Sequence, residues 1–210
     1  MVDENVNIIR LKTETVFDHT WLRDTVESFQ TFLLSQYRCV IFAEIDEFIY
    51  TSHKKLNETI DEFVEDTSVQ YQTVLGYDII QNDQESYIIN DTNTPMMQNR
   101  SYRVRRQDFD KTLITKMPIK YAEGFHEALN IPHKLYKYQF KLAHLHKIDK
   151  QMLLQRHKDR LTFKTSSDIF GQHNKTTEDE YLLNAFYYAN NHESMRELIP
   201  EADKQSLKML

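Results

Sequence analysis

The feature that most constrains the fold is an apolar run, Cys-Val-Ile-Phe-Ala at 39–43, which ends abruptly in the acidic stretch Glu-Ile-Asp-Glu-Phe at 44–48. An uninterrupted apolar run of this length predicts a strand that is buried on both faces. Such strands are typical of the parallel sheets of α/β domains, in which ligands gather at the carboxyl ends of the strands. We therefore expect a binding site at residues 44–48.

Two acids in this stretch, Glu44 and Asp46, are separated by one residue. Because side chains alternate along a strand, we expect both carboxylates to point the same way. Two carboxylates on one side suit a divalent cation, which in turn neutralises a diphosphate. The alternative is a strand that runs into solvent and ends in ordinary acidic residues.

Apolar periodicity predicts helices and strands that are interleaved along the chain, so the expected fold class is α/β. The helices are expected near 21–33, 56–64, 152–160 and 177–189, and the strands near 6–12, 39–43, 69–75, 102–105, 110–114 and 140–146. No composition shift marks a second domain. We expect one domain over residues 1–200 and a tail at 201–210.

The chain has 210 residues, enough to bury one substantial core. Its formal net charge of −6 disfavours nucleic acid as a partner, because phosphate contact favours basic surfaces. No run approaches the ~20 apolar residues that span a bilayer, and residues 1–10 lack the features of a secretion signal. We therefore expect a soluble, cytoplasmic protein with no membrane span, in which the single cysteine, Cys39, is a small core residue.

The acidic stretch at 44–48 is followed by four further segments: Leu-Gly-Tyr at 75–77, Asp-Lys-Thr-Leu-Ile at 110–114, Gly-Phe-His at 124–126 and His-Leu-His-Lys-Ile-Asp at 144–149. In this order, over about residues 36–150, they resemble glycosyltransferases with the GT-A fold, especially family 2-like enzymes. The resemblance implies a mostly parallel mixed sheet flanked by helices. It also implies transfer of a hexose from a nucleotide-diphosphate sugar to a glycan or other hydroxyl acceptor.

The chain departs from the family pattern at two places. The first acid of the motif is Glu44 rather than Asp, so its carboxylate lies one methylene further out. Only a strand at 6–12 and one helix precede the motif, whereas the family usually has two strand–helix units that hold the nucleotide base. We therefore expect either a fragment or minimal version of the domain, or a nucleotide base that is held in an unusual way.

Glycosyl transfer requires the leaving diphosphate to be stabilised, and a divalent ion acting as a Lewis acid supplies this. Asp46 is the first choice as its ligand, and Glu44 is expected to bind the ion through water or to hold the ribose. Carboxylate oxygens suit Mg²⁺ or Mn²⁺, and an added imidazole favours Mn²⁺. The resemblance implies a late histidine in the metal site, for which we favour His144 slightly over His146.

His144 and His146 are two residues apart on a predicted strand, which places them on one face about 6.5 to 7 Å apart. This spacing is wide for one ion. We therefore expect one histidine to bind the metal and the other to shape the pocket. The alternative for both is a surface histidine or a hydrogen-bonded core histidine.

Two roles remain, phosphate binding and removal of the acceptor proton. Neither of the glycine-rich phosphate loops G-x-x-x-x-G-K-[ST] and G-x-G-x-x-G is present, so a diphosphate needs basic side chains besides the metal. Lys111 and the arginines at 100–106 are candidates, and the alternative for them is a solvated strand edge. The candidate proton acceptors are Glu123 and His126, with Glu127 and Asp149 also possible.

Two other functions fit the same residues. One is a metal-dependent phosphoesterase that uses the same acids and histidines, although two-metal hydrolysis usually needs more ligands. The other is a non-catalytic relative that binds a glycan or a partner chain, which Glu44 and the short N-terminal portion make plausible.

Overall fold

The computed structural model describes residues 18–82, 84, 85, 96–162, 177 and 196–208. Its elements in chain order are α1 (His19–Leu34), β1 (Val40–Ile41), β2 (Glu47–Tyr50), α2 (Leu56–Glu65), β3 (Tyr71–Thr73), β4 (Leu75–Ile80), η2 (Met96–Asn99), β5 (Tyr102–Arg105), η3 (Gln107–Phe109), β6 (Thr112–Thr115), β7 (Lys141–His144), α3 (Lys150–Thr162), β8 (Arg196–Leu198) and α7 (Glu201–Ser206). The helices expected near 21–33, 56–64 and 152–160 are thus confirmed as α1, α2 and α3, whereas the one expected near 177–189 lies, apart from Thr177, outside the described residues. The strand expected at 6–12 lies outside the described residues.

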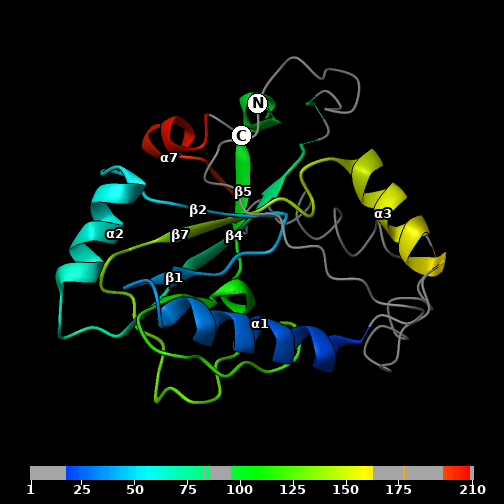
Figure 1. Ribbon diagram of the computed structural model, residues 1–210. Coiled ribbons are helices and arrows are strands. Elements are labelled where there is room, and N and C mark those ends of the chain that lie inside the picture. Colours follow the sequence, from blue (N-terminus) through cyan, green and yellow to red (C-terminus); the bar gives the residue numbers. More distant parts are fainter. Residues whose placement is uncertain (1–17, 83, 86–95, 163–176, 178–195, 209–210) are drawn as a thin grey trace, which may run out of the picture.

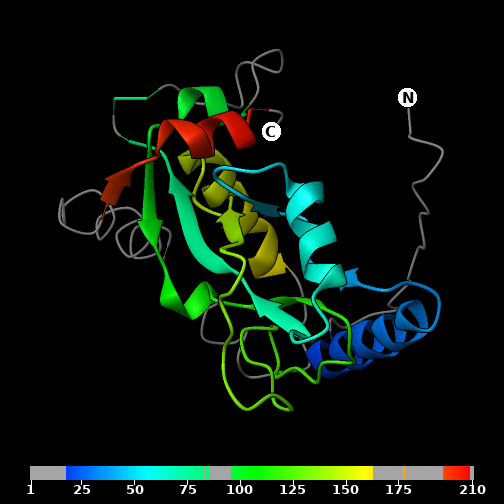
Figure 2. The same cartoon turned by 90° about the vertical axis from the view of Figure 1, so that its left-hand side faces the viewer.

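The strands form two sheets, one of three strands in the order β1-β6-β3 and one of five in the order β2-β7-β4-β5-β8. Helices lie around them, with α2 and α3 on opposite sides (Figures 1 and 2). The α/β class expected from the sequence is therefore present. Within the larger sheet, β7 lies between β2 and β4 and positions most of the candidate site.

The expectation of a mostly parallel sheet is wrong. Among the strand pairs that the structure describes, only β4–β7 is parallel, and the other five are antiparallel. The prediction rests on a long strand buried on both faces at 39–43, whereas β1 is only two residues long and Ile41 is 38% exposed. The apolar run is thus divided between a short strand and the loop that follows it.

The core is built on both sides of the sheets. Phe63 of α2 packs with Leu113 and Ile114 of β6 and with Leu142 of β7. All four side chains are fully buried. Full burial of such a side chain contributes about 1.5 to 3 kcal/mol each. This packing gives the end of β7 a rigid support.

The first helix is held to the rest of the protein largely by polar side chains. Glu27 accepts a hydrogen bond from the backbone N–H of Tyr121 (2.7 Å), and Gln30 accepts one from the N–H of Ile119 (2.7 Å). Both side chains are buried, while Trp21 of the same helix is 40% exposed. The helix is therefore where the sequence predicts it, but polar residues make much of its buried contact.

The tail expected beyond residue 200 is instead part of the fold over the described residues. Residues Glu201–Ser206 form α7, and Leu207 is buried in the same cluster as Tyr50 and Ile79. Asp203 of α7 is fully buried and pairs with Arg103 and Lys141. The C-terminal helix is thus anchored to the larger sheet by apolar packing and by buried ion pairs.

Candidate metal centre and adjoining pocket

Three predicted site residues meet where β2 begins and β7 ends. Asp46 precedes β2, His144 is the last residue of β7, and His146 follows two residues later. Oδ2 of Asp46 lies 3.9 Å from Nε2 of His144 and 3.8 Å from Nδ1 of His146. One ligand atom from each residue lies within 4.8 Å of the other two. The backbone N–H of Leu145 donates to the carbonyl of Asp46 (2.8 Å), which holds the two segments together.

The expected separation of the two histidines is wrong. Their rings stack at 5.6 Å between centroids and 5° between planes. The strand spacing does not apply, because β7 ends at His144 and the chain turns at His146. Both imidazoles therefore face the same carboxylate.

This donor set fits a divalent cation. One carboxylate oxygen and two imidazole nitrogens within 4.8 Å are close enough to bind a single ion from one side. A hydrogen bond with His146 lowers the pKa of Asp46 to about 2 against the effect of burial, and the charges of His144 and Arg156 add to this. The carboxylate is therefore ionised at neutral pH, as a metal ligand must be.

A second carboxylate, Asp78 of β4, lies behind His144. Asp78 is opposite His144 in the parallel β4–β7 pair, and its Oδ1 lies 2.7 Å from Nδ1 of His144. Its other oxygen accepts from Lys147 (2.9 Å) and from Arg106 (3.1 Å). Burial raises the pKa of Asp78, but the hydrogen bond to His144 and the charge of Lys147 more than offset this and hold it below its usual range.

The Asp78 contact sets the tautomer of His144. An ionised carboxylate can only accept, so Nδ1 of His144 carries the proton and donates it to Asp78. In the neutral ring, Nε2 then presents its lone pair on the side of Asp46, as a metal ligand requires. Carboxylates that hold ligating histidines in this way are common around protein metal sites. Asp78 is not among the site residues that the sequence motifs indicate, although an acid inside the apolar strand Leu75–Ile80 is a signal that could have identified it.

An aromatic ring covers His144 from the other side. Phe109 of η3 stacks on the imidazole at 4.3 Å between centroids. This close approach depends on Gly76 of β4, because a Cβ at that position would lie 2.5 Å from Cβ of Phe109. The glycine thus lets η3 pack over the strand, and the phenyl ring excludes water from one face of His144.

Lys111 is buried and paired with two acidic side chains. Its Nζ is 2.7 Å from Oε2 of Glu44 and 2.5 Å from Oε1 of Glu47, and the side chain is fully buried. Burial lowers the pKa of Lys111, but the charges of Glu47 and Glu44 outweigh it and the pKa is raised. The geometry is that of an anchor for Glu44 rather than the phosphate contact predicted from the sequence.

The two predicted proton acceptors lie on a strained turn, in which Gly124 and Phe125 have positive φ angles of 79° and 61°. Glu123 accepts a hydrogen bond from Thr20 of α1 (2.9 Å). The ring of His126 lies edge-on to Phe109, and its Nδ1 is 2.9 Å from the carbonyl of Asp108. Neither side chain belongs to the group formed by Asp46 and the two histidines.

Asp149, a further candidate for that role, has a structural place. Its Oδ1 accepts from the backbone N–H groups of Gln151 (2.9 Å) and Met152 (3.1 Å), and thus caps α3. Its Oδ2 pairs with the buried Arg100. The side chain is fully buried, which leaves it no face for a substrate.

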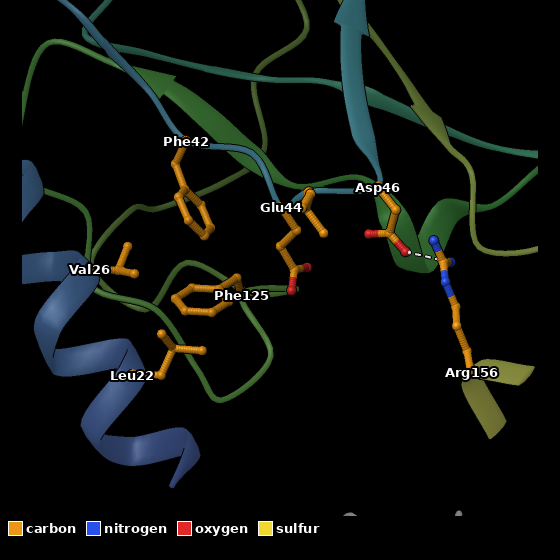
Figure 3. Close-up of a pocket in the computed structure, with 8 residues that line it drawn as sticks. Leu22, Val26, Phe42, Glu44, Asp46, Phe125 and Arg156 are labelled. Atoms are coloured by element: carbon orange, nitrogen blue, oxygen red, sulfur yellow. Dashed lines mark hydrogen bonds and ion pairs between the residues drawn. The ribbon is translucent and has the colours of Figure 1, made fainter. Parts of the chain in front are cut away.

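A pocket of about 420 Å³ adjoins the metal centre (Figure 3). Its lining residues are Leu22, Val26, Phe42, Glu44, Ile45, Asp46, Phe125 and Arg156. The apolar members come from α1, from the loop after β1 and from the turn at Phe125, whereas Arg156 reaches in from α3. The pocket therefore has an apolar wall and a charged rim that includes Asp46 of the candidate metal centre. Glu44 and Asp46 both line it although residues 42–46 do not form a strand.

The comparisons with protein-family models, with curated proteins and with solved structures gave no match for this chain. Among the described residues, none of the helices combines the length and the apolar character needed to cross a bilayer.

Proposed function

We propose that this chain is a GT-A-like glycosyltransferase domain that uses a divalent cation and a nucleotide-diphosphate sugar. The observation that supports this most directly is the convergence of His144 and His146 on Asp46, which lines the same pocket as Glu44. The motif order that resembles family 2-like enzymes is the second support. The proposed donor class follows from the resemblance, and the proposed cation follows from the ligand set.

In the proposed reaction, the bond between the anomeric carbon and the diphosphate oxygen breaks while the acceptor hydroxyl oxygen bonds to that carbon. The cation, when bound, neutralises the charge that develops on the leaving diphosphate. Asp46, His144 and His146 hold this cation. Glu44, oriented by Lys111, faces the pocket and binds the ribose or a metal-bound water.

The acceptor proton goes to Glu123 or His126 in this proposal. The carbonyl of Asp108 can only accept, so Nδ1 of His126 donates to it and Nε2 keeps a lone pair. Glu123 lies on the α1 side of the turn whose Phe125 lines the pocket. Glu123→Gln and His126→Gln distinguish the two residues. Only the substitution of the true base should lower kcat, by about 10²- to 10⁴-fold, and it should leave the metal affinity unchanged.

The metal centre is tested by calorimetric titration with Mn²⁺ of the wild type, Asp46→Asn, His144→Ala and His146→Ala. Each substitution removes one of three ligands from the same ion, so each should weaken the Mn²⁺ affinity by about tenfold or more, ~1.4 kcal/mol. Asp24→Asn, an exposed acid on α1, is the control and should bind like the wild type. A histidine variant that keeps full affinity would exclude that histidine as a ligand.

Turnover tests the donor class. Each nucleotide sugar is incubated with Mn²⁺ and a set of hydroxyl acceptors, and release of the nucleoside diphosphate is followed. Transfer that disappears in Asp46→Asn supports the proposal. Mn²⁺ binding without release from any nucleotide sugar would contradict it.

A metal-dependent hydrolase is the second candidate, because the same donor set also suits hydrolysis. Two histidines and one carboxylate also occur in catalytic zinc centres, where the open position carries a water. Release of phosphate from a phosphodiester that contains no sugar, with Zn²⁺ preferred to Mn²⁺, would favour this candidate over glycosyl transfer.

A further inference from the structure

Arg156 of α3 makes an ion pair with the carboxylate that faces both histidines. Its Nη1 lies 3.2 Å from Oδ2 of Asp46 (Figure 3). The same oxygen lies 3.9 and 3.8 Å from the imidazole nitrogens of His144 and His146. A single oxygen therefore has three partners. A cation bound by the three ligands needs this oxygen as well.

The position of Arg156 is set by the fold. Asp149 caps the first turn of α3, and Leu153 and His157 on either side of Arg156 are buried. The Arg156 side chain is one-third exposed and lines the 420 Å³ pocket. The helix is thus fixed while the end of the side chain can turn into the pocket.

A divalent cation and the guanidinium cannot both stay close to Oδ2 of Asp46 without strong repulsion. A bound Mg²⁺ lies about 2.0 to 2.1 Å from a carboxylate oxygen, and two positive charges at such separations repel strongly in a partly buried site. The cation therefore displaces Arg156. The displaced guanidinium then lines a pocket whose other walls are mostly apolar, where it needs an anionic partner.

We propose that Arg156 is an exchangeable counter-ion: it neutralises Asp46 until a divalent cation binds, and then binds the phosphate oxygens of the ligand that this cation brings into the pocket. A guanidinium suits this role because its planar fork pairs with two phosphate oxygens at once. This inference rests on the metal centre of the proposed function. It adds a phosphate subsite and an order of binding, with the cation first and the phosphate second.

The exchange predicts that Arg156→Gln raises the affinity for Mn²⁺ alone and lowers the affinity for a complex of Mn²⁺ with a phosphate ligand. Arg156→Gln removes the competitor of the cation, so Mn²⁺ alone should bind about tenfold more tightly, ~1.4 kcal/mol. The same variant lacks the phosphate contact, so the preformed complex of Mn²⁺ with inorganic pyrophosphate should bind about tenfold more weakly than it binds to the wild type. Arg156→Lys keeps the charge and should keep the weaker Mn²⁺ affinity.

The experiment is calorimetric titration at low ionic strength, first with Mn²⁺ alone and then with the preformed pyrophosphate complex. Lys158→Gln, which removes an exposed positive charge from the same helix, is the control and should match the wild type in both titrations. Thermal unfolding of each variant checks that it folds.

Two results would overturn the exchange while leaving the metal centre intact. In one, the wild type binds Mn²⁺ and Arg156→Gln binds it equally or more weakly. In the other, Arg156→Gln binds Mn²⁺ more tightly but binds the pyrophosphate complex like the wild type, which removes the phosphate subsite. A wild type that binds no Mn²⁺ would overturn the metal centre of the proposed function together with the exchange.

Discussion

At the residue scale, three neighbouring side chains fix the position of His144. Asp78 fixes its Nδ1, Phe109 stacks on its ring, and Asp46 faces its Nε2. A histidine held on three sides loses little rotational freedom when it binds an ion. We therefore expect Asp78 to contribute to metal affinity although it does not face the ion.

Asp78→Asn should weaken Mn²⁺ affinity by about 10- to 100-fold, as is typical when a carboxylate behind a ligating histidine is removed. An asparagine amide can donate to Nδ1, which would favour the tautomer whose Nε2 carries the proton and cannot bind metal. The measurement is calorimetric titration with Mn²⁺.

The control for this variant is Asp108→Asn. Asp108 also pairs with Arg106 but does not contact His144. Its Mn²⁺ affinity should equal that of the wild type. Equal affinities in Asp78→Asn and Asp108→Asn would show that Asp78 only neutralises Arg106 and Lys147.

At the residue scale, the residue types of the candidate site could be predicted from the sequence, but the side chains that each residue contacts could not. Asp46, His144 and His146 follow from residue type and motif, and the structure brings these three together. Lys111 is a basic residue of the right kind, yet its partners are Glu44 and Glu47. Arg156 is separated from Asp46 by more than a hundred residues, so only the packing of α3 shows that they meet.

At the scale of elements, α7 links strands of the larger sheet through ion pairs of one carboxylate. Asp203 pairs with Lys141 of β7 and with Arg103 of β5, and these strands flank β4. Arg103 also donates to Tyr50 of β2 (3.0 Å) and lies 3.9 Å above the ring of Tyr77 in β4. One helical carboxylate therefore connects strands from most of the sheet.

Asp203→Asn should destabilise the protein by about 3 kcal/mol at pH 7, because it leaves the buried Arg103 and the partly buried Lys141 without their full counter-charge. Tm should fall by ~6 to 12 °C for a chain of this size. Thermal unfolding followed by circular dichroism measures this, with Asp24→Asn as an exposed control that should change the stability by less than about 0.5 kcal/mol.

The difference in stability between the wild type and Asp203→Asn should depend on pH. Burial raises the pKa of Asp203, but its hydrogen bonds with Ser52, Lys141 and Arg103 outweigh this and lower the pKa below its ordinary value. The stability from Asp203 is therefore complete above the unfolded pKa of about 3.9 and is lost as the pH falls through the lower folded pKa. The difference in Tm between the wild type and Asp203→Asn should narrow below about pH 4, and a constant difference down to pH 2.5 would contradict the ionised pair.

Elements with clear periodicity could be predicted, whereas sheet direction could not. The apolar spacing of Leu56, Ile60 and Phe63 predicts α2 correctly. Strand direction depends on which strands become neighbours, and this is decided by contacts far apart in the sequence, such as β2 with β7. The helix α7 is short and mostly polar, so it resembles a tail in the sequence. Its place in the fold likewise depends on contacts with residues far away in the chain.

At the scale of the whole molecule, the metal centre joins segments that are far apart in the chain. Asp46 comes from the loop before β2 and the histidines from the end of β7, about a hundred residues later. A cation that binds all three residues binds only the folded state. Metal binding and folding should therefore be thermodynamically linked.

Mn²⁺ at 100 times its Kd should stabilise the protein by about 2.7 kcal/mol, which is ~5 to 11 °C in Tm. Differential scanning fluorimetry with a Mn²⁺ series measures this, and excess EDTA should reverse it. Asp46→Asn, whose affinity is expected to be at least about tenfold weaker, should be stabilised by at most ~1.4 kcal/mol at the same Mn²⁺ concentration. A shift of equal size in Asp46→Asn would mean that the ion binds elsewhere.

The register of β7 has one further consequence. His144 lies opposite Glu47 of β2 on one side and opposite Asp78 of β4 on the other. If β7 paired one residue out of step, Ala143 or Leu145 would take that position and every side chain of the strand would change face. A chain with this error could not assemble the ligand set, so the ability to bind metal reports whether β7 has paired in its correct register.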